Sequence, residues 1–220
     1  MRRTALALMM LAFAGTGLAA QESARERAQR TLAPQIFEEL SLLAAEMSTS
    51  GVPDEPLYVK ALEGAAKRVP PERLVPAVRE YAARLGEARL AFGAGAPVPL
   101  LVAGADALQR GVSGEALRSL PSDRPRSPMA VLALAELLES GVPIGRALEI
   151  LREAMAQRTA DDGMLDISAR VRQLIRQGVA PQDAVDRVRR ALLSERARIG
   201  PSVPPGSEPI SRDRPRNPGP

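Results

Sequence analysis

The 220-residue chain contains no cysteine, no histidine and no tryptophan, and aromatic residues make up 2% of it. The absence of cysteine excludes disulfides, thiolate nucleophiles and thiolate zinc sites. The absence of histidine removes the commonest general base and the commonest metal ligand. We therefore expect no metal site, no cofactor and no catalytic site, and we predict a protein that acts by binding.

The first residues predict an export signal. Arg2 and Arg3 precede an apolar run from Ala5 to Leu18, and small residues then lead into a polar segment at Gln21. A basic start, a short apolar core and small residues before a cleavage site are typical of a secretory signal peptide. We expect residues 1–20 to be removed and the protein to be periplasmic or extracellular. An uncleaved membrane anchor is the alternative.

Apolar residues recur along the chain at three- and four-residue spacing, and the alternating runs typical of strands are absent. The pattern predicts an all-α fold, either an irregular helical-hairpin repeat similar to an α-solenoid or a multi-helix bundle. Pro76 is expected to kink its helix or to restart it at Val75. The expected helices cover residues 34–49, 54–67, 71–91, 99–110, 113–120, 128–140, 143–157, 164–177 and 181–198.

The composition divides the rest of the chain into segments. Residues 21–33 are polar and are expected to fray or to form a surface helix, and residues 34–199 are expected to form the helical domain. Stretches rich in proline and glycine at 92–99 and 121–128 are candidate hinges. Residues 200–220 contain seven prolines and little that could form a core, so we predict a disordered tail.

One turn motif recurs between the predicted helices. A glycine just past a helix adopts the left-handed conformation that ends it, and an apolar residue that follows packs back on the last turn. We expect these valines to meet the residue five positions earlier, which is Met47, Ala107, Leu137 or Leu174. The motif occurs as Gly51-Val52, Gly111-Val112, Gly141-Val142 and Gly178-Val179, with Arg68-Val69 as a degenerate copy.

The helices that follow these turns also share an apolar phase, which supports a repeat of helical hairpins. In four copies, apolar residues stand five, six and nine positions after the valine, and the Val112 copy is one residue shorter. We predict that this face is buried. Its members are Leu57, Tyr58 and Ala61; Leu74, Val75 and Val78; Ala116, Leu117 and Leu120; Ala147, Leu148 and Leu151; Ala184, Val185 and Val188.

The C-terminal part of the chain is basic. From Ile167 to Pro220 there are 11 arginines against five acidic residues, whereas Gln21 to Asp166 carries 17 basic against 21 acidic residues. Five arginines of the last helix form a candidate anion-binding face for anionic lipid, lipopolysaccharide or an acidic protein. The alternative is a solvated outer face on a helix that caps the core. These residues are Arg187, Arg189, Arg190, Arg196 and Arg198.

Motifs that could support catalysis are incomplete. Gly93 to Pro97 lacks the strand and the lysine of a phosphate loop, and Gly111 to Gly114 misplaces a glycine of the nucleophile elbow. Asp161 to Gly163 lacks the spacing of a calcium loop and is expected to cap a helix. Glu139-Ser140 resembles the catalytic Glu-Ser pair of lytic transglycosylases, but the Gly-rich and Tyr-containing motifs that follow it in that family are absent.

These observations predict an exported, non-catalytic helical binding or scaffold protein. Its stacked helices would leave a groove or concave surface for a protein or peptide partner. An anionic membrane or lipopolysaccharide surface, bound through the Arg-rich helix, is the second interpretation. A carboxylate-dependent glycan-cleaving enzyme is the third. Nucleic acid is not expected as a partner, because export separates the two and aromatic stacking platforms are missing.

Overall fold

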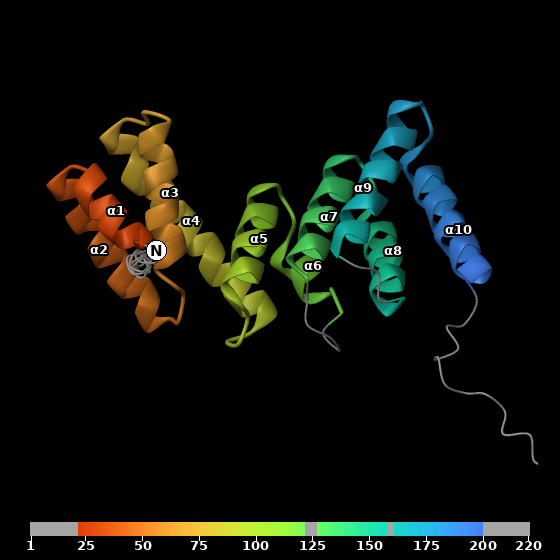
Figure 1. The fold of residues 1–220 in the computed structure, drawn as a ribbon, viewed down its shortest axis with the longest axis horizontal. Coiled ribbons are helices and arrows are strands. Elements are labelled where there is room, and N and C mark those ends of the chain that lie inside the picture. Colours follow the sequence, from red (N-terminus) through yellow and green to blue (C-terminus); the bar gives the residue numbers. More distant parts are fainter. Residues whose placement is uncertain (1–21, 122–126, 158–160, 200–220) are drawn as a thin grey trace, which may run out of the picture. The chain divides into compact units, whose positions relative to one another are not determined.

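The computed structural model describes residues 22–121, 127–157 and 161–199, and this part of the chain contains helices and no strand (Figure 1). Its 10 helices make up 79% of the described residues. The predicted all-α class is therefore confirmed. The predicted signal peptide (1–20), the predicted tail (200–220) and most of the stretch 121–128 lie outside the described residues.

The nine predicted helices correspond to α2 through α10, and their ends differ from the prediction by three residues at most. The largest difference is the start of α9, which begins at Asp161, three residues before the predicted start, so Asp161 to Gly163 belong to the helix that they were expected to cap. The helices are α1 (Ala24–Thr31), α2 (Pro34–Thr49), α3 (Glu55–Ala66), α4 (Pro71–Phe92), α5 (Val98–Gln109), α6 (Gly114–Arg118), α7 (Pro128–Glu139), α8 (Ile144–Ala156), α9 (Asp161–Arg176) and α10 (Pro181–Ile199).

The chain divides into two compact units. The first is Met1–Gln109 with Ser113–Arg118, and the second is Arg110–Val112 with Ser119–Pro220. The stretch 92–99, a candidate hinge, lies inside the first unit, where it joins two helices that pack against each other, α4 and α5. None of the described helices is both long and apolar enough to cross a membrane.

The recurring turns have the backbone that the sequence predicts. Gly51, Gly111, Gly141 and Gly178 have positive φ angles of 69°, 89°, 81° and 88°. Arg68, in the degenerate copy, adopts the same left-handed conformation with φ 57° although it carries a side chain. The local rule that ends these helices therefore operates in all five places.

Hydrogen bonds close four of the five turns as Schellman motifs. The valine amide donates to the carbonyl five positions back, and the preceding residue donates 2.9 Å bonds three positions back. The valine side chains are buried at Val52, Val112 and Val142 and half-buried at the other two turns. The five-residue bonds run from Val52 to Met47, Val69 to Gly64, Val142 to Leu137 and Val179 to Leu174, at 3.0–3.1 Å.

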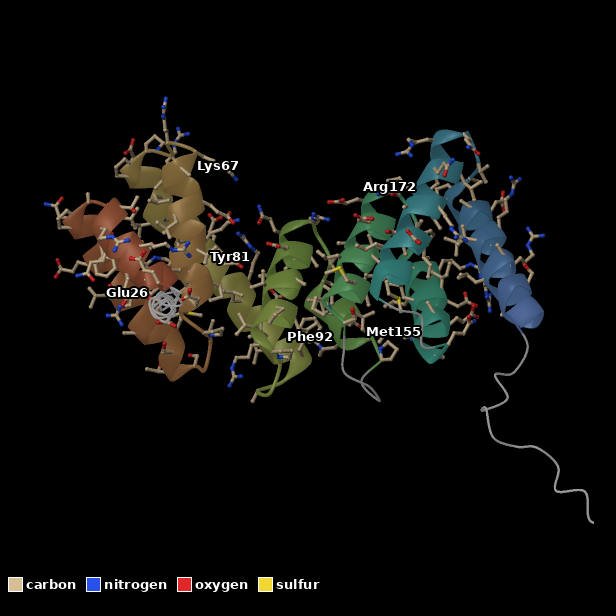
Figure 2. All side chains as sticks on the ribbon, in the orientation of Figure 1. Glu26, Lys67, Tyr81, Phe92, Met155 and Arg172 are labelled. Atoms are coloured by element: carbon tan, nitrogen blue, oxygen red, sulfur yellow. The ribbon has the colours of Figure 1, made fainter. Side chains whose placement is uncertain are left out.

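All fifteen residues of the predicted apolar phase are buried, so the shared phase is confirmed. In the first unit, α4 packs against α2, α3, α5 and α6 and is the central helix. Its buried Tyr81 and half-buried Phe92 are labelled in Figure 2. Burial raises the pKa of Tyr81 to about 12, so it is a neutral phenol at physiological pH.

Two features of helix α4 concern its proline and its contact with α5. Helix α4 runs through Pro76 without interruption, so the predicted restart at Val75 is wrong. Pro76 lies on the exposed face, where water can reach the Glu72 carbonyl, the acceptor that loses its helical donor. A close contact joins α4 to α5, because a Cβ placed on Gly104 would lie 2.8 Å from the Ala88 Cβ.

The segment expected to fray or form a surface helix is helix α1. Ser23 caps it, since the Glu26 amide donates to the Ser23 hydroxyl at 3.2 Å and the Ser23 amide donates to the Glu26 carboxylate at 3.0 Å. Ala24 and Ala28 are fully buried, and α1 packs against α3. The Ala24 amide also donates to the Glu55 carboxylate on α3 at 2.9 Å. The capping box and the buried alanines thus tie α1 to the first unit.

The second unit is built from α7, α8, α9 and α10. Helix α7 packs against α8 and α9, and α10 packs against the same two helices. Ser168 is the one buried polar residue identified in the described part of the chain, and its hydroxyl donates to the Glu136 carboxylate at 2.5 Å. Arg172 pairs with the same carboxylate at 3.4 Å. This polar contact links α7 to α9 within an otherwise apolar core.

Candidate functional site

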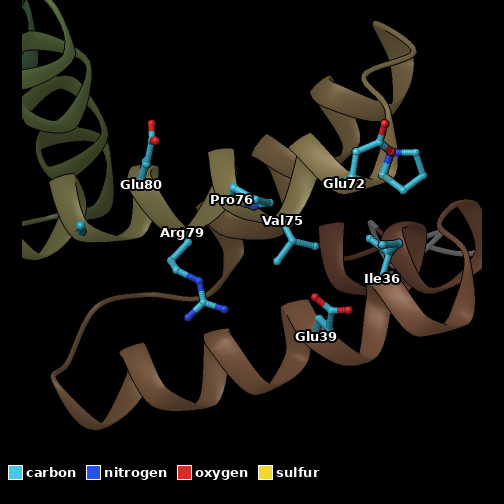
Figure 3. A pocket seen from close by; sticks show the side chains of 9 residues that line it. Ile36, Glu39, Glu72, Val75, Pro76, Arg79 and Glu80 are labelled. Atoms are coloured by element: carbon cyan, nitrogen blue, oxygen red, sulfur yellow. The ribbon is translucent and has the colours of Figure 1, made fainter.

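A groove of about 760 Å³ runs between α2 and α4 in the first unit (Figure 3). Two residues of α2 and seven of α4 line it. Five of the nine are apolar and four are charged. The lining residues are Ile36, Glu39, Pro71, Glu72, Val75, Pro76, Arg79, Glu80 and Ala83.

The two walls of the groove are parallel helices. At one end Ile36 and Val75 line the groove together. At the other end the Met47 side chain lies 3.7 Å from where a Cβ of Gly86 would be. Both pairs are 39 positions apart in sequence, so α2 and α4 run in the same direction with a constant register. They are parallel because α3 returns the chain between them.

The apolar lining of the groove continues along the exposed face of α4. Pro76, Ala83 and Leu90 are spaced by seven residues and therefore share one helix face. Leu90 is 81% exposed, and Leu42 on α2 is 68% exposed. These are the two most exposed large apolar side chains recorded in the described residues.

Charges surround this apolar lining. Glu39 and Arg79 extend from opposite helices into the space between them, whereas Glu72 and Glu80 stand on the other edge of α4 (Figure 3). Glu80 pairs loosely with Arg84, at 3.9 Å. Helix α2 carries three glutamates and no lysine or arginine. The nine lining residues thus include three carboxylates and one guanidinium, and one of these carboxylates, Glu80, is paired with Arg84 outside the lining.

A smaller hollow of about 360 Å³ lies where α2 ends, beside the α4–α5 connection. Its polar centre is Arg89, whose Nε donates to the Ser50 carbonyl at 2.8 Å and whose Nη1 donates to the Ala94 carbonyl at 2.9 Å. Arg89 thus holds the connection 93–97 against the first predicted turn. The Gly-rich stretch Gly93 to Pro97 is therefore a connection between α4 and α5.

The Arg-rich face of α10 is divided by the structure. Arg189 turns toward α8, where its Nη1 lies 2.7 Å from Glu149 and its Nε donates to Glu153 at 2.7 Å. Arg187 and Arg190 are exposed, and the Arg190 Nε also donates to the Asp186 carbonyl at 3.2 Å. The backbone of Arg196 and Arg198 belongs to α10, but their side chains lie outside the described part.

The α8–α10 contact is an ion-pair network. Arg146 bridges Glu149 at 3.0 Å and Asp186 at 3.5 Å, while Arg189 joins the two α8 glutamates. The hydrogen bond from Arg146, reinforced by Arg189, lowers the pKa of Glu149 below its usual value. The neighbouring Glu153 raises the pKa of Arg189. Arg189, a predicted anion-binding residue, is thus engaged in holding α10 to α8.

Residues of the incomplete catalytic motifs have structural contacts. Glu139 is exposed on the last turn of α7 and pairs with Arg110 at 3.7 Å. The Ser140 hydroxyl donates to the Glu136 carbonyl at 2.7 Å. Ser113 accepts a hydrogen bond from the Ala116 amide at 3.1 Å and so caps α6. No cluster of three potential metal ligands occurs within residues 22–121, 127–157 and 161–199.

The sequence did not reveal the α2–α4 groove as a site. Its lining residues come from two helices separated by α3, and no local motif marks them. The one sequence signal is the seven-residue recurrence of Pro76, Ala83 and Leu90 on a face that the buried pattern of α4 leaves open. No protein-family model matches the chain, and comparisons with curated proteins and with solved structures find no match either.

Proposed function

We propose that the protein is an exported, non-catalytic helical binding protein and that its α2–α4 groove holds a segment of a protein or peptide partner. The observation that supports this proposal is the groove between α2 and α4, in which five of the nine lining residues are apolar. Full burial of one leucine side chain is worth about 1.5–3 kcal/mol. A partner segment that occupies the groove and also covers Leu42 or Leu90, which are exposed on the same two helices, would gain binding free energy of this order.

Site-specific photocrosslinking tests the proposal. A photoreactive amino acid is placed at Ala83, inside the groove, or at Ala77, which is exposed on another face of the same helix. The full chain is expressed in an exporting host and irradiated. We expect a discrete crosslinked species from position 83 and none from position 77. Equal crosslinking from both positions, or none from position 83, would contradict the proposal.

An anionic surface is the second candidate partner, and three exposed side chains of α10 favour it. Arg187 and Arg190 are exposed, and Leu193 is 47% exposed. A basic helix with an exposed apolar residue can lie on anionic lipid. Sedimentation with vesicles of acidic phospholipid tests this, using Arg187→Gln with Arg190→Gln. We expect binding that weakens at high salt and in the double variant. Binding that is unchanged by salt and by the two substitutions would exclude an anionic surface as the partner of this helix.

A further inference from the structure

We infer that the occupant of the α2–α4 groove is an amphipathic helix whose apolar face is flanked by lysine or arginine. This inference rests on the function proposed for the same groove and adds the conformation and the charge of the partner. Three properties of the first unit support it: the kind of groove, the spacing of its apolar residues and the excess of carboxylates around it.

The kind of groove favours a helical partner. An extended peptide usually adds to the edge of a sheet, and the described residues contain no strand. Polyproline segments usually dock on aromatic side chains, and none of the nine lining residues is aromatic. Two parallel helices with a shallow apolar groove between them instead match the helix-in-groove mode, in which a third helix completes the packing.

The spacing of the apolar residues sets the length of the partner. Pro76, Ala83 and Leu90 recur every seven residues, which is the repeat of helices packed side by side. From Pro76 to Leu90 the helix rises about 21 Å at 1.5 Å per residue. A partner helix of about 14 residues, or four turns, would cover this stripe. The small side chain of Ala83 would let its backbone approach closely.

The charges favour a basic partner. Glu39 lies within the groove and Glu72 adds a second carboxylate along its edge, where Glu80 is paired with Arg84. Arg79, the single guanidinium of the lining, extends from the facing wall and opposes the charge of Glu39. A cation on the partner would therefore be attracted by Glu39 and repelled by Arg79. Substituting these two residues should change the affinity in opposite directions.

Two synthetic helical peptides of 18 residues test the inference. Both carry leucine at the same heptad positions, and the flanking positions are lysine in one and glutamate in the other. Binding of each labelled peptide to the full chain is measured by fluorescence anisotropy at about 50 and 300 mM salt. We expect the lysine peptide to bind at least about fivefold more tightly at low salt, and this preference to shrink at high salt because screening weakens exposed charge pairs.

Four single variants locate the binding. Glu39→Gln should weaken binding of the lysine peptide by about two- to fivefold, and Arg79→Gln should strengthen it by a similar factor. Ala83→Arg should weaken binding at least about tenfold by filling the centre of the groove. Ala77→Arg adds the same charge to the same helix outside the groove and is expected to bind as the wild type does. Circular dichroism establishes that each variant is folded.

The outcomes separate the inference from the proposal on which it rests. If both peptides bind equally and Ala83→Arg weakens both, the groove binds helices but the inferred charge of the partner is wrong. Tighter binding of the glutamate peptide would also overturn the inference. If neither peptide binds at about 1 mM, or if Ala83→Arg changes nothing, the helical occupant is overturned. Crosslinking from position 83 without peptide binding would leave the proposed function standing alone.

Discussion

Substituting Gly178 by alanine adds one methyl group and tests whether the turn there needs a left-handed backbone. Gly178 has φ 88°, and a Cβ built on it would meet no atom within 4 Å. Gly178→Ala therefore introduces no clash, and its effect reports the backbone conformation alone. The left-handed conformation costs a residue with a side chain about 1–2 kcal/mol. The lower entropy of the unfolded alanine chain offsets about 0.4–1 kcal/mol, which leaves a net loss of about 1 kcal/mol.

A matched control lies in the same unit. Gly145 is exposed in the first turn of α8, has no positive φ, and has open space where a Cβ would lie. Gly145→Ala should therefore increase stability by about 0.5 kcal/mol through helix propensity. The assay is urea denaturation of the full chain, followed by circular dichroism at 222 nm. If Gly178→Ala is as stable as the wild type, or if both variants shift in the same direction, the explanation of the turns is refuted.

Three further predictions concern other parts of the fold. Arg68→Gly should raise the free energy of unfolding by about 0.5–1 kcal/mol, because glycine adopts the left-handed conformation of Arg68 without strain. The melting temperature should rise with it, and an unchanged melting temperature would contradict this explanation. Gly104→Ala should lower the free energy of unfolding by about 1–3 kcal/mol in denaturant titration, because the new methyl group would meet Ala88 and Phe92. Unchanged stability would contradict the close contact between α4 and α5. The lowered pKa of Glu149 adds stability above its usual pKa of about 4.3 that is lost as the pH falls further. The stability difference between wild type and Glu149→Gln should therefore be largest near pH 7 and vanish in acid; a constant difference across this range would contradict the ion-pair network.

The helices and turns could be predicted because their causes are local. A glycine that ends a helix and a valine that packs back on it depend on residues within five positions, and the turn at Gly51-Val52 needs nothing more distant. The degenerate turn at Arg68 is a useful exception, since there the surrounding helices impose the left-handed conformation on an unfavourable residue.

Helix α1 shows what a local pattern cannot supply. The capping box at Ser23 and Glu26 was present in the sequence, but eight residues rarely form a stable helix alone. Its stability depends on burial of Ala24 against α3 and on the Glu55 carboxylate, 31 positions away from Ala24. Such a contact is set by the packing of the whole unit.

The candidate sites depended on packing even more strongly. The Arg-rich face of α10 was recognisable as a pattern, but the sequence could not indicate that Arg189 meets Glu149 and Glu153 on α8. The groove arises from the parallel packing of α2 and α4, which are not adjacent in the chain. Predicting a groove was possible, whereas predicting which helices form it was not.

The most direct test of the account is an NMR titration of the isotope-labelled full chain with the lysine peptide. We expect saturable shifts that are largest for the methyl groups of Ile36, Val75 and Ala83, with Leu42 and Leu90 at the margins. Shifts that are confined to α10, or spread evenly over both units, would contradict the claim that the protein works through the groove between α2 and α4.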